Sequence, residues 1–307
     1  MSEESKEYNP LDSEYHYEIN YPKPGIQVNG QKHYNHRHLS MDEGFLWTAA
    51  RMNRIIEKAP LKVFVADLNY DFWCPWRLTN VKHAILGQID ACGELILDSG
   101  IGDPNIKNPE LIEQAERMGE GVTWVVPKDY SNDTDATIAS VKEFFSLAPE
   151  WIKDRAIVPL QGTCPEDYVR CYEELKHLSR AGYFGFGGIA GKSLTKAPTM
   201  QSVQAKKAAV KFLLDNTDVQ QIHLFGQTNL NWVDMYHDDR IVSCDSNRFG
   251  ADALHRFDVP RGPNSGGMYG WLVMSEFYAF LMRISDGYRP QGRQPKQHEF
   301  GDFFGEQ

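Results

Sequence analysis

Cysteine is scarce in this sequence and follows no disulfide or metal-site pattern. The 307 residues include five cysteines, an odd number, with no C-x-x-C pair and no zinc-finger spacing. The N-terminus lacks the basic and then apolar order of a secretion signal. The longest apolar stretch, Met268 to Met282, is interrupted by Glu276 and is too short for a relaxed membrane span, so it predicts a core helix. These absences favour a reduced, cytoplasmic location without membrane contact.

Positive charge is also in deficit, which argues at first sight against a nucleic-acid partner. The formal net charge is -10 and the sequence pI is about 5.5, whereas phosphates favour basic surfaces. The deficit is uneven, because residues 1–20 hold six acids against one lysine and supply -5 of the -10. Between Lys192 and Lys211 there are five lysines and no acid. The net charge therefore does not exclude a nucleic acid.

A linker that would divide the chain into domains is absent too. Residues 1–39 are rich in tyrosine, proline, asparagine and acids, which predicts an extended, acidic and polar N-terminal arm. Order is expected to begin where Ser40 and Glu43 form a capping box, and Pro60 ends the helix that follows. With 41% hydrophobic residues the chain has ample material for a buried core. We expect residues 40–307 to form a single domain that ends in a helical C-terminal segment.

Short apolar runs alternate with helical patterns through the body of the chain. Seven runs predict strands, at residues 63–66, 94–97, 122–126, 156–160, 183–186, 221–225 and 241–244. One intervening helix is expected to open with a capping box of Thr163 and Glu166 and to stop at Gly182. This alternation indicates an α/β fold, either an open doubly wound sheet or a closed (β/α)8 TIM barrel. The seven runs, an eighth strand expected near Phe257 and the chain length favour the TIM barrel.

Polar residues or glycines follow nearly every predicted strand. The active site of a TIM barrel lies at the carboxyl ends of its strands, so these residues would meet at one rim. They are Asp67, Asp98, Lys128 with Asp129, Gln161, Gly187 with Gly188, Gly226 and Asp245. Loops are polar in general, which would explain any one of them without a function. Together, three carboxylates, an amide and a glycine can bind a planar ligand and supply a nucleophile and an acid/base.

Five segments resemble those of the tRNA-guanine transglycosylases, barrel enzymes that exchange guanine for a 7-deazaguanine. In the family's order, over roughly residues 60 to 250, they are L-I-L-D-S-G (95–100), V-P-L-Q-G (158–162), F-G-G-I-A-G (186–191), L-F-G (224–226) and C-D-S-N-R (244–248). The resemblance implies a pentosyltransferase on a TIM barrel.

The resemblance also implies a role for each matching residue. Asp245 would be the nucleophile that attacks the sugar C1′, and Asp98 the general acid/base that handles the proton of the base nitrogen. The implied base-binding residues are Asp129, Gln161, Gly187, Gly188, Phe225 and Gly226. Two carboxylates with different pKa values suit these two tasks, because one must hold a proton while the other attacks. Aromatic residues after the first strand are expected to line the pocket: Tyr70, Phe72, Trp73 and Trp76.

The chain departs from the family at its zinc site. The C-terminal C-x-C-x-x-C…H cluster is absent, since the last cysteine is Cys244, so no zinc and no other cofactor is expected. In the tRNA enzymes that region supports tRNA binding, and a zinc-less relative more closely resembles the DNA-modifying branch of phages and genomic islands. The implied function is a DNA guanine transglycosylase inserting a base such as 7-cyano-7-deazaguanine, in the host cytoplasm if the protein is viral. The alternatives are an enzyme acting on tRNA, a non-catalytic accessory subunit, and an unrelated barrel hydrolase using Asp98 and Asp245.

Several basic residues are expected to contact the backbone of the nucleic acid. They are Lys192, Lys196, Lys206, Lys207 and Arg248. An ordinary solvated helix face explains the lysines equally well. Gly191, Lys192 and Ser193 imitate the end of a P-loop, but Phe186 stands where that motif requires glycine. The histidines at 33, 36 and 38 are interpreted as surface residues rather than a metal site, and homodimer formation is left open.

Overall fold

The computed structural model describes residues 27–28, 31–32, 49–66, 72–100, 105–189, 203–251 and 268–285. The chain divides into two compact units, residues 1–59 with 252–307 and residues 60–251. The first unit holds the antiparallel pair β1 (Gln27–Val28) and β2 (Gln31–Lys32), and the mutually contacting helices α1 (Ala49–Lys58) and α10 (Met268–Ser285). The expected arm boundary at residue 39 and the capping box at Ser40 lie outside the described residues.

Helix α10 coincides with the core helix expected from the longest apolar stretch. Most of its described side chains are buried, including Phe277 and Tyr278. Glu276 is buried as well. In the described parts of the chain, no helix is both long enough and apolar enough to cross a membrane.

The second unit is a ring of eight parallel strands. They are β3 (Lys62–Ala66), β4 (Cys74–Asn80), β5 (Cys92–Asp98), β6 (Trp124–Val126), β7 (Val158–Leu160), β8 (Tyr183–Phe186), β9 (Gln221–Leu224) and β10 (Ile241–Ser246). The last strand, β10, pairs with the first, β3. Between β6 and β7, Val125 donates to the carbonyl of Arg155 at 2.8 Å and Ile157 donates to that of Val125 at 2.9 Å. The predicted (β/α)8 TIM barrel is confirmed, and the open doubly wound sheet is wrong.

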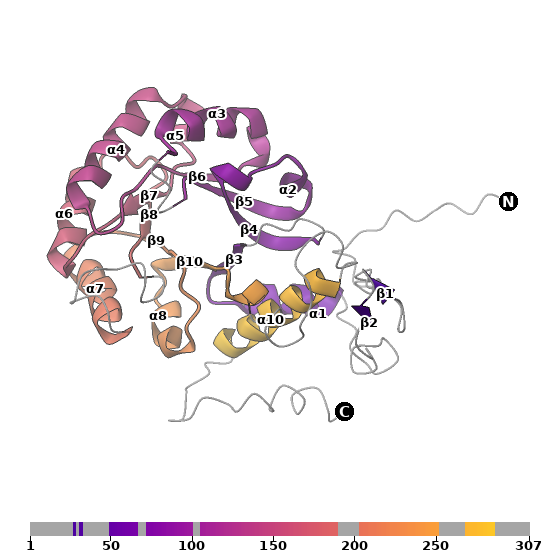
Figure 1. Ribbon diagram of the computed structural model, residues 1–307. Coiled ribbons are helices and arrows are strands. Elements are labelled where there is room, and N and C mark those ends of the chain that lie inside the picture. Colours follow the sequence, from indigo (N-terminus) through magenta and orange to yellow (C-terminus); the bar gives the residue numbers. More distant parts are fainter. Residues whose placement is uncertain are drawn as a thin grey trace. The chain divides into compact units, whose positions relative to one another are not determined.

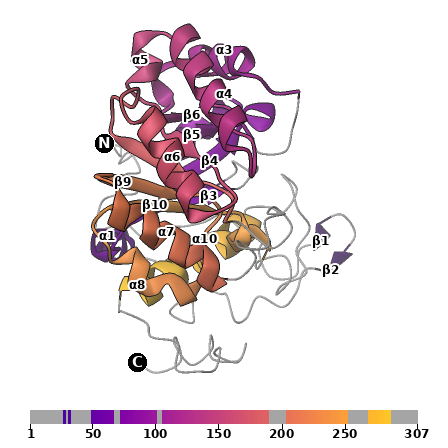
Figure 2. The ribbon, with the colours of Figure 1, turned by 90° about the vertical axis from the view of Figure 1, so that its left-hand side faces the viewer.

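Helices cover the outside of this ring. They are η3 (Val81–His83), α2 (Gly87–Asp90), α3 (Asn108–Met118), η4 (Gly119–Gly121), α4 (Thr134–Leu147), α5 (Glu150–Lys153), α6 (Pro165–Leu175), α7 (Val203–Asn216), η6 (Leu230–Trp232) and α8 (Val233–Tyr236). Figure 1 shows α3, α4, α6 and α7 outside the strands, and Figure 2 shows α6 between α4 and α7, which it contacts. The helical spacing of Tyr168, Cys171, Tyr172 and Leu175 places these buried residues on one side of α6.

The eighth strand lies early in the chain, so its predicted position near Phe257 is wrong. All eight strands fall between Lys62 and Ser246, and Phe257 itself is outside the described residues. The missed strand is β4, which reads C-P-W-R-L-T-N. Trp76, expected in a loop that lines the pocket, is a buried residue of this strand.

Helix α6 begins and ends differently from the sequence expectation. It starts at Pro165, and its N-cap residue Cys164 makes no side-chain cap hydrogen bond. Instead, the carboxylate of Asp167 accepts hydrogen bonds from the N and Oγ1 atoms of Thr163, at 2.9 and 2.8 Å. The helix ends at Leu175 rather than Gly182. The carboxylate that joins Thr163 to the helix is therefore that of Asp167, not that of Glu166.

Candidate active site

Three carboxylates converge at the carboxyl ends of the strands. Asp98 is the last residue of β5, Asp129 follows β6, and Asp245 lies near the end of β10. Asp129 and Asp245 are buried, whereas Asp98 is half-buried. Burial, and then the charges of Asp129 and Asp245, raise the pKa of Asp98 to about 7. At neutral pH, Asp98 can therefore both hold and release a proton.

Lys128 places a positive charge beside this cluster. Its side chain is buried, and its Nζ atom donates to the carbonyl of Gly100 at 2.9 Å. The Lys128 charge lowers the pKa of Asp98 and that of Asp129, but burial outweighs it in both. The Lys128 backbone N–H donates to Oδ1 of Asn108 at 3.0 Å. Both the backbone N–H and the side chain of Lys128 therefore hold the segment after β6 in place.

Asp129 and Gln161 form a buried pair. The Nε2 atom of Gln161 donates a hydrogen bond to Oδ2 of Asp129. Burial raises the pKa of Asp129, and this hydrogen bond opposes the shift. The Oε1 atom of Gln161 is buried and has no hydrogen-bond partner among the described residues. A buried acceptor without a partner is costly for a protein, so the pair favours a ligand that brings a donor.

Glycines after β8 allow the backbone to approach Gln161 closely. A Cβ atom on Gly187 would lie 2.1 Å from Nε2 of Gln161, so any side chain there would force the Gln161 amide to shift. Gly188 has φ of 74°, a left-handed conformation that favours glycine. The hydroxyl of Tyr168 donates to the carbonyl of Gly187 at 3.0 Å and fixes this turn from α6. The structure thus brings together the predicted base-binding residues at 129, 161, 187 and 188.

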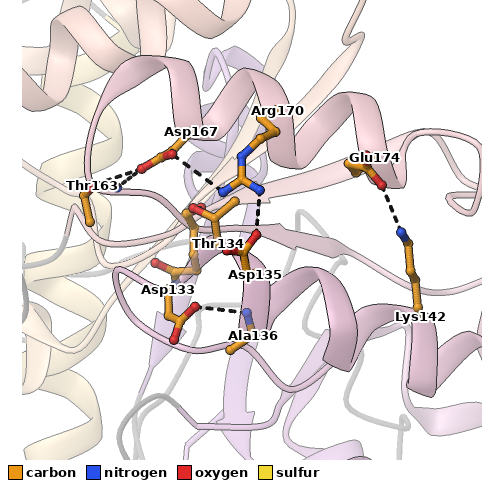
Figure 3. Close-up of polar contacts among 10 residues, drawn as sticks. Asp133, Thr134, Asp135, Ala136, Lys142, Thr163, Asp167, Arg170 and Glu174 are labelled. Carbon is orange, nitrogen blue, oxygen red and sulfur yellow. Dashed lines mark hydrogen bonds and ion pairs between the residues drawn. The ribbon is translucent and has the colours of Figure 1, made fainter.

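Two loops of the rim are joined through α4. Thr134, the first residue of α4, donates from its hydroxyl to the carbonyl of Gln161 at 3.0 Å. On the outer surface, Arg170 of α6 bridges Asp135 at 2.6 Å and Asp167 at 3.8 Å, as Figure 3 shows. The start of α4, which follows the loop that carries Asp129, is therefore tied to the segment after β7 by a buried hydrogen bond and to α6 by an exposed ion pair.

Asp245 is oriented through one of its two oxygens. Its Oδ1 atom accepts a hydrogen bond from the backbone N–H of Gly226 at 2.8 Å and lies 3.0 Å from Nε2 of His223. Gly226 has φ of 68°, so the turn that aims this N–H favours glycine. The half-buried ring of Phe225 is 4.6 Å from the His223 ring, edge to face. Phe225 and Gly226 thus lie in the immediate surroundings of Asp245.

No family model matches the chain, and no curated protein matches it. Within the described ranges, no three His, Cys, Asp or Glu side chains are grouped to hold a metal ion.

Sequence reasoning missed two parts of this site. His223, Ser243 and Tyr183 form a hydrogen-bonded series behind Asp245. Asn80, at the end of the missed strand β4, is in register with Asp98, and its buried Oδ1 atom has no described partner. The alternation of side chains along a strand could have indicated His223 and Ser243. Residues 223 and 225 share one side of their strand, and so do residues 243 and 245.

Of the predicted backbone-contacting residues that the structure describes, Lys206 does not face solvent. Lys206 is buried, and its Nζ atom donates to the carbonyl of Ile189 at 2.9 Å. Lys207 pairs with Asp234, whereas Arg248 is exposed just after β10. The burial of Lys206 follows from its helical spacing, because it lies on the same side of α7 as the buried residues Ala209, Val210 and Leu213. Lys192, Lys196, Asp67 and Tyr70 lie outside the described residues.

Proposed function

We propose that the protein is a DNA guanine transglycosylase that exchanges guanine for a 7-deazaguanine base, such as the 7-cyano form. The observation that carries this proposal is the burial of Asp98 beside Asp129 and Asp245, which raises the pKa of Asp98 to about 7. A glycosyl exchange needs an oriented carboxylate as the nucleophile and a second carboxyl that gives and takes a proton at neutral pH. Asp245 and Asp98 have these two properties.

The first half of the exchange releases guanine. Oδ2 of Asp245 attacks C1′ of the deoxyribose, a C1′–O bond forms, and the bond from C1′ to N9 of guanine breaks. The electron pair of the broken bond goes to N9, and Asp98 donates its proton to the departing base. The strand is then covalently attached to Asp245, and Asp98 is a carboxylate.

The second half inserts the new base. Asp98 accepts the proton from the corresponding nitrogen of the incoming 7-deazaguanine, and that nitrogen attacks C1′. The C1′–O bond breaks, and its electron pair returns to Asp245. Both carboxyl groups are restored, so the exchange needs no oxidant, energy source or cofactor.

The pair of Asp129 and Gln161 suits a guanine edge. Guanine and 7-deazaguanines present a ring N–H and an amino group side by side, next to a carbonyl. The carboxylate of Asp129 can accept from the two donors, while Gln161 offers both an N–H and the unpartnered Oε1. We assign Phe225, half-buried next to His223, to the flat face of the base.

DNA is favoured over tRNA as the polymer because the chain has no cysteine after Cys244. Residues 245–307 of this sequence therefore do not match a zinc region of the kind that supports tRNA binding. Arg248, exposed just after Asp245 in the sequence, is the described residue we assign to a backbone phosphate. Lys192 and Lys196 remain expected contacts of the same kind.

The test is exchange of labelled guanine into DNA and into tRNA side by side, followed by mass spectrometry of the nucleosides. We expect incorporation into DNA, and loss of it together with the covalent adduct on a denaturing gel in Asp245→Asn. The control is Asp215→Asn, which makes the same change on α7, where Asp215 pairs with Lys211. Full exchange by Asp245→Asn would refute the mechanism, and exchange into tRNA alone would replace DNA as the substrate.

A further inference from the structure

A series of buried polar groups runs from Asp245 into the barrel. Nε2 of His223 lies 3.0 Å from Oδ1 of Asp245, and Nδ1 of the same ring lies 2.5 Å from Oγ of Ser243. The hydroxyl of Tyr183 makes a further hydrogen bond to Oγ of Ser243. His223 and Ser243 are fully buried, and Tyr183 is nearly so. The series therefore joins strands β8, β9 and β10 below the rim.

The proton positions in this series can be assigned from its end members. Burial raises the pKa of Tyr183 far above its usual value, so the phenol keeps its proton and donates it to Ser243. The hydroxyl of Ser243 is then available to donate to Nδ1 of His223, which makes Nδ1 an acceptor. A ring proton on Nε2, facing Asp245, completes this arrangement. All donors point toward the carboxylate, an arrangement in which neighbouring hydrogen bonds strengthen one another.

Two aromatic rings hold the imidazole in place. Phe64 of β3 and Phe225 after β9 both meet it edge to face, at 5.9 Å and 4.6 Å between centroids. The ring therefore has polar contacts only through its two nitrogens, and turning it over would put a carbon against Asp245 or Ser243. The geometry fixes both the ring and the nitrogen that faces the carboxylate.

We propose that His223 is a positioning residue for Asp245, held as the neutral Nε2–H tautomer by Ser243 and Tyr183. With Gly226, it saturates Oδ1 of Asp245, and Oδ2 is the oxygen presented to C1′. Oδ2 has no hydrogen-bond partner in the described part of the chain. The inference rests on the proposed exchange reaction for its consequence in kcat, while the tautomer itself does not depend on that reaction.

The first test separates positioning from simple stability. His223→Leu removes both nitrogens, and we expect kcat for exchange to fall by about 100-fold because the nucleophile loses its fixed geometry. KM for the incoming base should remain unchanged, since the pair of Asp129 and Gln161 is intact. His223→Gln keeps an N–H near the Nε2 position and should recover most of the lost kcat. Equal kcat in wild type and His223→Leu would overturn the inference.

Variants farther along the series keep the test valid if His223→Leu does not fold. Ser243→Ala and Tyr183→Phe leave the imidazole in place but remove the groups that set its tautomer, so both should lower kcat without raising KM. The control is Tyr172→Phe, which removes a tyrosine hydroxyl that bonds to Asp218, in the segment between α7 and β9. Reductions that match the control would overturn the inference.

The second test reads the tautomer directly. In protein labelled with 15N-histidine, the spectrum of His223→Gln subtracted from that of wild type identifies the two ring nitrogens. At neutral pH we expect a protonated Nε2 and an unprotonated, hydrogen-bonded Nδ1. A proton on Nδ1, or on both nitrogens, would refute this inference even if exchange is observed. Absence of exchange by wild type would instead refute the proposed function.

Discussion

The amide of Gln161 occupies the space where a side chain at position 187 would lie. A Cβ atom on Gly187 would be 2.1 Å from Nε2 and 2.7 Å from Cδ of Gln161. The same Nε2 atom donates to Asp129. Gly187 is thus required because it lets the end of β8 approach the pair that we assign to the guanine edge.

Gly187→Ala should weaken base binding without touching the catalytic carboxylates. The new methyl group must displace the amide of Gln161, which breaks the hydrogen bond to Asp129, and we expect KM for the incoming base to rise by about 10-fold or more. A matched control is Gly182→Ala, because Gly182 has φ of 64° and open space around its Cβ position at the start of β8. This control loses stability through the backbone but should keep its KM. Equal KM values in the two variants would contradict the prediction.

Most of the barrel was predictable because seven strands are short apolar runs that stand out from helical patterns. The strand β4 was not, because Pro75, Arg77 and Asn80 interrupt its apolar character. Arg77 is fully buried, donates to the carbonyl of Phe72 at 2.9 Å and lies over the Phe72 ring at 4.8 Å. These contacts with the segment just before the strand give the buried guanidinium its partners, and they cannot be inferred from local hydrophobicity.

The release of guanine should depend on pH through Asp98. Since the pKa of Asp98 is about 7, the protonated acid is the major form below pH 7 and decreases tenfold per pH unit well above it. Single-turnover release of labelled guanine should therefore be fastest in mildly acidic buffer and decline above about pH 7. Asp98→Asn should lose release at every pH. A wild-type rate that stays constant from pH 6 to pH 9 would exclude Asp98 as the acid.

The same shift has a consequence for stability. The pKa of Asp98 rises from 3.8 to about 7 on folding, so the folded state binds the proton more tightly and stability is lost as pH rises through this window. The loss is at most about 4 kcal/mol. Asp98→Asn cannot ionise and should gain unfolding free energy relative to wild type between pH 5 and pH 8 in urea titrations. Asp215→Asn should show no such gain, and an equal gain in both variants would contradict burial as the cause.

Removing the charge of Asp129 should move the titration of Asp98. After burial, this charge is the largest cause of the raised pKa of Asp98, so Asp129→Asn should shift the decline in guanine release to lower pH. The matched control is Asp133→Asn in the same loop, where asparagine also caps α4 well and the side chain is exposed. An unchanged midpoint in Asp129→Asn would mean that the two carboxylates do not interact.

The residues at the site differ in how far the sequence could reveal them. Asp98, Asp129 and Gln161 end strands that the sequence identifies, so the fold alone predicts that they meet. His223 lies within an apolar strand, and its partner Ser243 is 20 positions away on the next strand. The hydrogen bond between His223 and Ser243 can be inferred only when the register of β9 and β10 is known. The prediction for Lys206 was based on its position in an acid-free stretch, which indicated a surface charge. The residue instead lies on the buried side of α7.

The buried hydrogen bond from α4 to Gln161 and the exposed ion pair between α4 and Arg170 of α6 should contribute unequally. Thr134→Val keeps the shape of the side chain but removes the buried donor to the Gln161 carbonyl, which should cost about 1 kcal/mol of unfolding free energy. It should also raise KM for the base several-fold, because Gln161 is less firmly held. Arg170→Ala removes only exposed ion pairs, with side chains 48% and 84% accessible for Arg170 and Asp135, and should cost less than about 1 kcal/mol. The KM of Arg170→Ala for the base should equal that of wild type. If Arg170→Ala raised this KM as much as Thr134→Val does, the outer ion pairs drawn in Figure 3, and not the buried hydrogen bond, would position Gln161.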